Sequence, residues 1–203
     1  MIPIAKEGLP FILPLGGVSV VSFLLGFPVL AALALFSLGF VAFFFRDPER
    51  EVSQGEGLIL SPADGRVVAV RPSPGKGIRV SIFLSLFDVH INRAPVTATV
   101  SEVLYRPGAF KVAFAEEASR VNEQNLIRFA SPQGELLMRQ IAGVLARRIV
   151  CWVRPGQKVE AGERIGLIRF GSRVDLELPL RAEVRVKEGD RVRGGLDVIG
   201  VML

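Results

Sequence analysis

The 38 residues from Gly8 through Phe45 contain no Asp, Glu, Lys, Arg or His. As one helix this stretch would be about 57 Å long at ~1.5 Å per residue. The hydrocarbon core of a bilayer is only about 30 Å thick, so the stretch is too long for a single spanning helix. Pro28 follows Gly26 near the middle, where proline readily breaks a helix. We therefore expect an apolar, membrane-inserting hairpin of two helices, at residues 9–25 and 29–45.

The two ends of such a hairpin face the same side of the membrane. Lys6 precedes it, and the rest of the chain carries the net charge of +5, so the positive-inside rule places that side in the cytoplasm. A cleaved signal peptide fits poorly, because the stretch is long and lacks a small-residue cleavage pattern. A hairpin that only dips into the bilayer is an open alternative. The predicted location is the cell membrane, with residues 46–203 on its cytoplasmic side.

Residues 46–203 have ordinary polarity and are numerous enough for one compact domain. Short β-like runs dominate this part, with Gly and Pro between them, which is typical of an all-β barrel or sandwich. The runs are residues 65–70, 78–83, 97–104, 125–129, 148–153, 164–170 and 174–178. One short helix is expected at residues 110–120.

A weak internal repeat relates residues 153–162 to residues 186–195, with glycines and valines at matching positions. Each copy reads as strand, glycine turn, strand, and resembles the biotinyl/lipoyl-like barrel-sandwich architecture. The expected fold class is mainly β, a barrel-sandwich domain preceded by the apolar helical hairpin. A biotinyl or lipoyl carrier needs an exposed Lys at a hairpin tip, and residues 169–175 contain none. A non-catalytic, membrane-tethered adaptor of this fold is retained as an alternative function.

The residue counts exclude several other classes. With one Cys (Cys151) and one His (His90), the chain can form neither an internal disulfide nor a Cys/His zinc site, and no metal site is predicted. One Tyr and one Trp leave few platforms for base stacking, so nucleic acid is not an expected partner. Cys151 lies in an apolar run, where a buried structural thiol is expected rather than a nucleophile.

The pair Gly171-Ser172 offers a specific chemistry. A Ser hydroxyl can attack the preceding carbonyl when the turn is strained and a base is near, which gives an ester by an N-to-O acyl shift. Elimination then breaks the chain, and the resulting dehydroalanine hydrolyses to an N-terminal pyruvoyl group. Glycine at 171 suits this reaction because it tolerates unusual dihedral angles and leaves the carbonyl accessible.

His90 is the only imidazole available as the general base. A carboxylate that orients the ring would complete the arrangement. Asp88 is one candidate, because residues two apart share a face of a strand. Asp64, in a Pro-Ala-Asp-Gly turn, is the other, and spacing alone does not choose between them.

Several segments, taken in order, resemble the phosphatidylserine decarboxylase family of the short microbial type, and together they cover almost the whole chain. They are residues 44–50, 61–65, 88–95, 140–150 and 170–172, together with 108–110 followed by 122–125, where Gln124 replaces an Arg of the family pattern.

The resemblance implies a pyruvoyl-dependent proenzyme that cuts itself between Gly171 and Ser172. The products would be a β chain of residues 1–171 and an α chain of residues 172–203, headed by a pyruvoyl group made from Ser172 as the cofactor. Asp64, His90 and Ser172 match the family's self-cleavage triad, which favours Asp64 over Asp88. Arg93 stands where longer members carry a second His, and it is a candidate for binding the substrate's phosphate or carboxylate.

The implied reaction is decarboxylation of phosphatidylserine to phosphatidylethanolamine and carbon dioxide, through a Schiff base between the substrate amine and the pyruvoyl ketone. An archaeal ether lipid with the same headgroup is an equivalent substrate for this chemistry. Expected partners are the lipid, the membrane, the two processed chains and a further copy of the chain. A serine hydrolase that uses Ser172, His90 and Asp64 is a rival, but no Gly-x-Ser-x-Gly motif supports it.

Overall fold

The computed structural model describes residues 3–73, 77–112, 117–132, 134–144, 148–169 and 171–202. The chain divides into two compact units, one that ends at Glu49 and one that begins at Arg50. Each unit is described by itself below.

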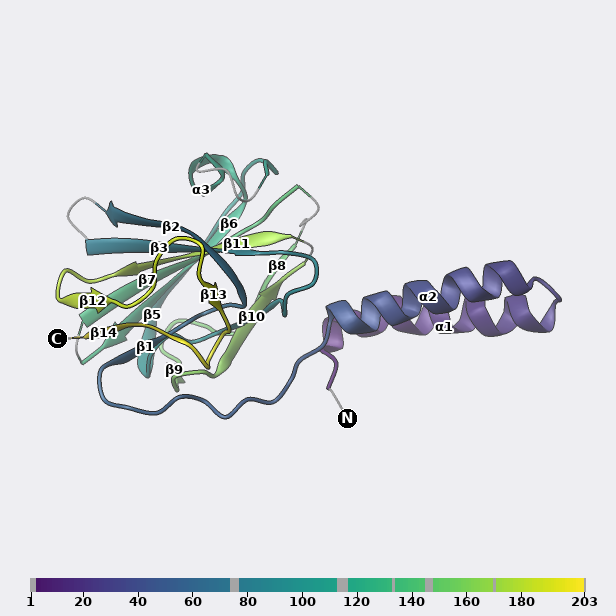
Figure 1. The fold of residues 1–203 in the computed structure, drawn as a ribbon, viewed down its shortest axis with the longest axis horizontal. Coiled ribbons are helices and arrows are strands. Elements are labelled where there is room, and N and C mark those ends of the chain that lie inside the picture. The colour runs from purple at the N-terminus through teal and green to yellow at the C-terminus, as the bar shows by residue number, and fades with distance from the viewer. Residues whose placement is uncertain are drawn as a thin grey trace. The chain divides into compact units, whose positions relative to one another are not determined.

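Two antiparallel apolar helices make up most of the first unit (Figure 1). A short 3-10 helix, η1 (Lys6–Gly8), leads into α1 (Leu9–Leu24), and a tight turn connects α1 to α2 (Pro28–Phe44). Proline suits the first position of α2, because its fixed φ is helical and its missing N–H would have no helical partner there. Both helices lie within one residue of the spans expected from the sequence.

These helices expose apolar side chains to an unusual degree. Phe23 in α1 and Phe36 in α2 are 71% and 76% exposed. The segment Lys6–Leu24 is long and apolar enough to cross a membrane by length and composition, whereas α2 is a shorter apolar helix of 17 residues. Helices that are apolar on all sides are stable when apolar surroundings such as lipid cover them.

The second unit consists mainly of antiparallel strands, which confirms the expected mainly β fold class (Figure 1). The strands are β1 (Leu58–Leu60), β2 (Gly65–Ser73), β3 (Gly77–Leu84), β4 (Ile91–Arg93), β5 (Ala98–Arg106), β6 (Gln124–Ser131), β7 (Gly134–Ile141), β8 (Ile149–Cys151), β9 (Lys158–Val159), β10 (Arg164–Ile168), β11 (Ser172–Leu178), β12 (Ala182–Val184), β13 (Arg191–Val192) and β14 (Val198–Met202). Eight of them form one sheet in the order β13-β2-β3-β11-β7-β6-β5-β9. Two three-stranded sheets, β1-β14-β12 and β4-β10-β8, complete the unit.

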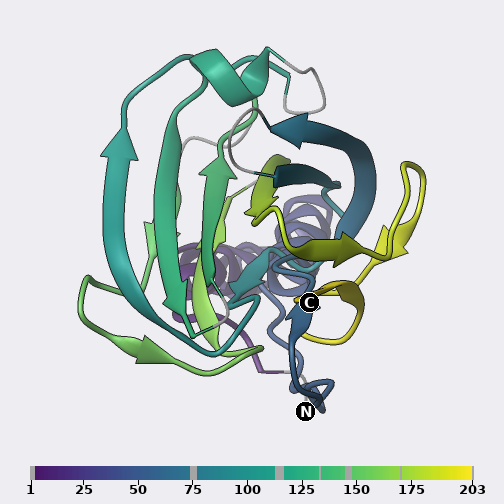
Figure 2. The ribbon, with the colours of Figure 1, turned by 90° about the vertical axis from the view of Figure 1, so that its left-hand side faces the viewer.

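The large sheet curls so that one face encloses the core (Figure 2). Alternate residues of its central strands point inward, because side chains alternate between the two faces of a strand. Val174 and Leu176 of β11 are fully buried, and so is Ile82, which lies opposite Val174 on β3. The inner face is therefore the apolar centre against which a buried site must be built.

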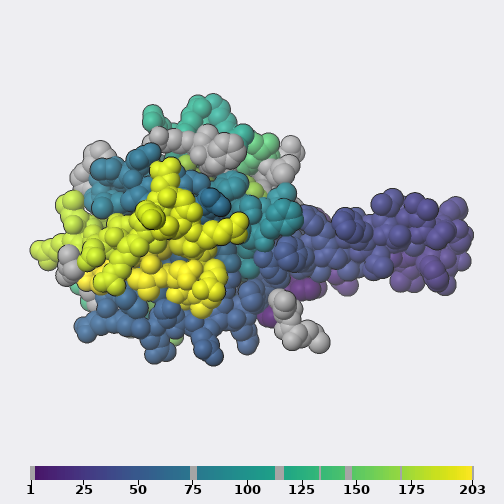
Figure 3. Space-filling model, in the orientation of Figure 1, coloured from purple at the N-terminus to yellow at the C-terminus, as the bar shows by residue number. Residues whose placement is uncertain are grey.

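The predicted internal repeat forms the two edges of the large sheet. β9 pairs with β5 at one edge and β13 pairs with β2 at the other. The C-terminal segment that contains β13, coloured yellow, forms much of the visible face of this unit in Figure 3. The two copies of the repeat thus supply the strands at the two opposite edges of one curled sheet.

Two sequence expectations differ from the structure. The helix expected at residues 110–120 is wrong as a single element: α3 is limited to Ala118–Val121, residues 110–112 are not helical, and residues 113–116 lie outside the described part. The strand β7 was not expected, because its residues include Glu, Leu, Met, Arg and Gln, which favour helices. Pairing with both β6 and β11 overrides that local preference.

Candidate active site

Ser172 is the first residue of β11, which lies between β3 and β7 near the middle of the large sheet. Gly171 precedes it with φ +62°, a left-handed conformation that favours glycine. A Cβ added at Gly171 would meet no atom within 4 Å, so the backbone angle rather than space explains the glycine. Phe170, which belongs to the expected motif, lies outside the described residues, as do Ala146 and Arg147 of another motif.

The Ser172 side chain points into the core. It lies on the same face of β11 as Val174 and Leu176, and its exposure is 0%. Within the described part of the chain, its Oγ atom has no hydrogen-bond partner. A buried hydroxyl without a partner is uncommon in folded proteins and is often functional.

Ser172 lies where the chain passes from one sheet to another. β10, which ends at Ile168, belongs to the small sheet β4-β10-β8, whereas β11, which begins at Ser172, belongs to the large sheet. We call this passage, between Ile168 and Ser172, the corner. Because β10 and β11 belong to different sheets, side chains from both sheets can meet on the inner side of the corner.

His90 lies beside the corner, immediately before β4. Its carbonyl oxygen accepts a hydrogen bond of 3.4 Å from the backbone N–H of Ile168. The Nδ1 atom is 3.0 Å from the carbonyl oxygen of Asp88. Because a carbonyl oxygen only accepts, Nδ1 carries the proton, and in the neutral ring the buried Nε2 atom holds the lone pair of a base.

The pairing register brings the Asp64 turn to the same end of the sheet as Ser172. Phe83 of β3 lies opposite both Arg66 of β2 and Arg173 of β11. The next row of paired residues runs from Ser172 of β11 across β3 to Gly65 of β2, the residue that follows Asp64. Two strand spacings of ~4.8 Å separate β2 from β11 in such a row.

The Asp64 carboxylate is held by an arginine and a backbone amide. Arg50 donates from Nη1 to Oδ1 at 2.6 Å and from Nη2 to Oδ2 at 2.8 Å, and the N–H of Gly194 donates to Oδ1 at 2.8 Å. Two parallel hydrogen bonds of this kind fix the orientation of a carboxylate. The position of Arg50 opposite Asp64 had no signal in the sequence, because 14 residues separate them.

The Asp88 carboxylate binds Ser85 in a turn. It accepts hydrogen bonds from the N–H and the hydroxyl of Ser85, at 2.8 and 2.6 Å. These bonds close the turn that leads from β3 to His90. The contact that Asp88 makes with His90 therefore comes from its backbone carbonyl.

Arg93, the last residue of β4, is buried, and its Nη1 atom donates to the carbonyl oxygen of Gly162 at 2.9 Å. It lines a cavity of about 370 Å³ to which Arg50 and Arg164 also contribute, together with Glu160 and Glu163. Arg93 therefore lines the same cavity as Arg50, the residue that binds Asp64. Alternation along β4 turns Arg93 to the side opposite its neighbour Asn92.

A buried ion pair directly follows Ser172. Arg173 Nε is 2.6 Å from Asp175 Oδ1, and both side chains are buried. Ser81 accepts a further hydrogen bond from Arg173, and Ser119 of α3 donates one to Asp175. Sequence reasoning missed this cluster, because charges at alternate positions of a strand normally indicate a solvent-exposed face.

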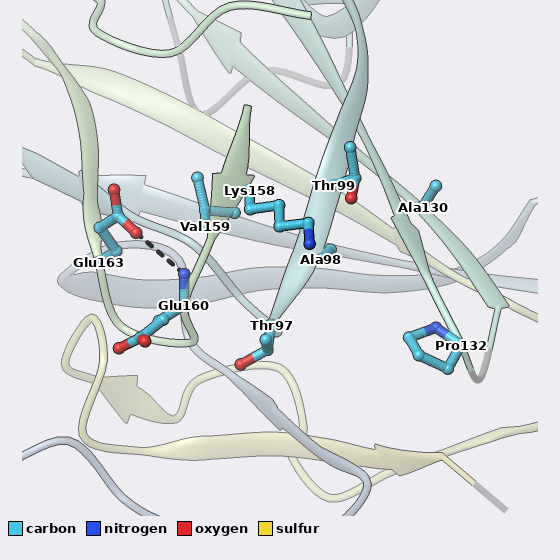
Figure 4. Close-up of a pocket in the computed structure, with 9 residues that line it drawn as sticks. All are labelled: Thr97, Ala98, Thr99, Ala130, Pro132, Lys158, Val159, Glu160 and Glu163. Atoms are coloured by element: carbon cyan, nitrogen blue, oxygen red, sulfur yellow. Dashed lines mark hydrogen bonds between the residues drawn. The ribbon is translucent and has the colours of Figure 1, made fainter. Parts of the chain in front are cut away.

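Two other features adjoin these residues. A cavity of about 600 Å³ is lined by β5, β6 and β9, and it includes Thr97, Lys158 and Glu163 (Figure 4). Burial raises the pKa of the Cys151 thiol on β8, so the reactive thiolate is disfavoured. Across the ranges that the structure describes, no three His, Cys, Asp or Glu side chains form a group suited to a metal ion.

Comparisons with known proteins agree on one family. The family model described as phosphatidylserine decarboxylase matches residues 38–200. A phosphatidylserine decarboxylase proenzyme of Magnetococcus marinus is 44% identical over 97% of this chain and 94% of its own length. Proteins with the same name from Desulfotalea psychrophila and Symbiobacterium thermophilum are 38% and 45% identical, over 100% and 97% of this chain and 98% and 94% of their own lengths.

Proposed function

The chain belongs to the phosphatidylserine decarboxylase family, and we propose that it is a proenzyme that cuts itself between Gly171 and Ser172. The active enzyme would then be a lyase that converts phosphatidylserine to phosphatidylethanolamine and carbon dioxide. Ser172 is both the nucleophile of the cleavage and the source of the pyruvoyl group.

The observation that carries this proposal is the state of Ser172. Its hydroxyl is buried and, as far as the structure describes the chain, has no hydrogen-bond partner, so no existing bond must be broken before it attacks. Gly171 holds the preceding peptide in a left-handed conformation. These features fit a residue that is to become a covalent prosthetic group inside the fold.

The cleavage follows from these residues in two stages. His90 Nε2 takes the Ser172 hydroxyl proton while Oγ bonds to the Gly171 carbonyl carbon. The C–N bond then breaks and the nitrogen takes up that proton, which leaves an ester and a free amine. Loss of the Ser172 α-proton, with rupture of the Cβ–Oγ bond, frees a Gly171 carboxylate and leaves dehydroalanine, and water then replaces its nitrogen as ammonia to give the pyruvoyl group.

We assign the supporting carboxylate to Asp64. Its position matches the family triad, and the bidentate bond from Arg50 fixes it as a charged group. Asp88 does not match the family triad, and its carboxylate accepts hydrogen bonds from Ser85. In this assignment Asp88 supports His90 through its backbone carbonyl alone.

In the mature enzyme the pyruvoyl group would supply the electron sink that decarboxylation requires. We assign to His90 the transfer of a proton to the carbon that loses carbon dioxide. Arg93, at the cavity that it shares with Arg164, is the proposed contact for the phosphate or carboxylate of the headgroup. Arginine is suited to this because its guanidinium binds phosphate and carboxylate through two bonds.

The apolar helices α1 and α2 are proposed as the membrane attachment. They bring an enzyme whose substrate is a lipid to the bilayer surface. The positive charge of the remaining chain favours the cytoplasmic side, where anionic lipids are enriched. Residues 1–45 are the proposed anchor and residues 46–203 the proposed catalytic domain.

Intact-mass analysis of the purified full-length chain tests the proposal. The expected result is two chains, of 171 and 32 residues, with a carbonyl-reactive group at the start of the shorter one. Ser172→Ala should remain one chain of 203 residues. A parent protein that stays intact and lacks the carbonyl would instead support the non-catalytic adaptor.

A further inference from the structure

Three buried amide side chains connect the large sheet to the small sheet β4-β10-β8. Asn125 Nδ2 donates to Gln140 Oε1 at 2.9 Å, and Gln140 Nε2 donates to Asn92 Oδ1 at 2.9 Å. We call Asn125, Gln140 and Asn92 the amide chain. Gly166 lets it pass, because a Cβ there would lie only 3.1 Å from Gln140 Nε2.

The amide chain ends in a donor that is not used. Asn92 is fully buried, and within the described residues its Nδ2 atom has no hydrogen-bond partner. Leaving such a buried donor unsatisfied destabilises a fold, so it calls for an explanation. The Oγ atom of Ser172 also has no hydrogen-bond partner among the described residues. The same interior thus holds a donor and a nucleophile that both lack a partner there.

The strand registers place the two groups near each other. Gln140 lies opposite Val174 on β11, and Asn92 lies opposite Gly166 on β10. Val174 is two residues from Ser172, and Gly166 is two residues from Ile168. The Gln140–Asn92 bond thus connects the neighbours of β11 and β10 at a level two residues along each strand from the corner.

His90 lies between Asn92 and the corner. It precedes Asn92 by two residues and continues the pairing of β4 with β10, so its side chain lies on the same side as that of Asn92. Its carbonyl is bonded to Ile168 at the corner itself. Asn92, His90 and Ser172 consequently converge on the inner side of the corner, while Arg93 turns the other way toward Gly162.

We propose that Asn92 Nδ2 donates a hydrogen bond to the oxyanion that forms on the Gly171 carbonyl when the Ser172 hydroxyl attacks it. This inference rests on the proposed self-cleavage. A donor fixed in advance, and aimed at charge that develops only during the reaction, stabilises the transition state more than the ground state. Gln140 holds the Asn92 carbonyl oxygen and so directs the Nδ2 end toward the corner.

The test follows the cleavage of the full-length chain during cell-free synthesis in the presence of phospholipid vesicles. Two variants of similar size, Asn92→Leu and Asn92→Asp, remove the donor. Losing one oxyanion donor should slow cleavage about 10²–10³-fold. Gln124→Leu is the matched control, because it removes a buried amide that lies outside the amide chain, and it should cleave within about threefold of the parent rate.

Hydroxylamine, which cuts esters, separates an effect on the acyl shift from a later effect. If Asn92 assists the first attack, the Asn92 variants build up uncut chain that hydroxylamine does not cleave. An Asn92→Leu chain that accumulates a hydroxylamine-labile ester would overturn the assignment, and so would either variant cleaving at the parent rate or Gln124→Leu being equally slow. A parent chain that never cleaves is a separate result, which removes the proposed function and this inference together.

Discussion

Arg50 binds both carboxylate oxygens of Asp64, and the two side chains are only 7% and 12% exposed. Arg50 is the first residue of the second unit and Asp64 immediately precedes β2. The pair therefore anchors the start of this unit to the turn that carries a proposed member of the cleavage triad.

Arg50→Met should destabilise the protein by about 3 kcal/mol, because it leaves the largely buried Asp64 carboxylate without its cation. Urea denaturation followed by circular dichroism measures the loss. Arg193→Met is the matched control: Arg193 pairs with Asp197 at the surface, where breaking an ion pair has little effect on stability. Equal losses in the two variants would contradict the structural role of Arg50.

Asp64→Asn should block cleavage, whereas Asp88→Asn should slow it only modestly by loosening the turn at Ser85. The first variant also leaves Arg50 buried without a full partner, which can affect folding. The double variant Arg50→Met/Asp64→Asn removes both charges and isolates the chemical effect. Precursor and product are quantified on denaturing gels. Cleavage that fails only in Asp88→Asn would reverse our assignment.

His90→Gln should leave the chain uncut for hours, because removing a general base typically costs 10²–10⁴-fold in rate. The substitution keeps a side chain of similar length, and a matching thermal midpoint would show that the fold is retained. Mass spectrometry at timed intervals measures the cut fraction. Parent-like kinetics in this variant would exclude His90 from the cleavage.

Removal of residues 1–45 should release the protein from membranes, because the exposed apolar surface of α1 and α2 is then absent. This truncation keeps Arg50 and its bond to Asp64. Flotation on a sucrose gradient with phospholipid vesicles compares the truncated and full-length proteins. Undiminished flotation of the truncated protein would locate the membrane contact in the second unit.

Cys151 should react slowly with a disulfide reagent at neutral pH, because burial raises its thiol pKa and keeps the thiolate fraction low. The rate should rise with pH and become fast in denaturant. Cys151→Ser should process and decarboxylate like the parent. Loss of cleavage in that variant, with the fold intact, would restore Cys151 as a candidate nucleophile.

The sequence predicts the two helices and the mainly β class well, because both depend on local composition. Proline at 28 and the absence of charge from Gly8 through Phe45 suffice for the helices. The repeat around Gly156 and Gly189 indicates the short strands but not that they form opposite edges of one sheet. That arrangement depends on pairing between distant segments, which local patterns do not encode.

The same reason separates the predicted site residues from the missed ones. Gly171, Ser172 and His90 have chemistry that is visible one residue at a time. Asn92 and Gln140 become a unit only when β7 approaches β4, 48 residues away in the chain. Arg173 appears in the sequence as part of a solvent-exposed alternation, and only tertiary packing buries it.

β11 is hydrogen-bonded on both sides, to β3 and to β7, over most of its length. A cut just ahead of it would therefore create a new chain end without creating a loose piece. The short fragment, which contains β11, β12, β13 and β14, would remain paired with strands of the longer one. Maturation of this kind is irreversible. It consumes water and releases ammonia, and the new chain end has no amino group from which the peptide bond could form again.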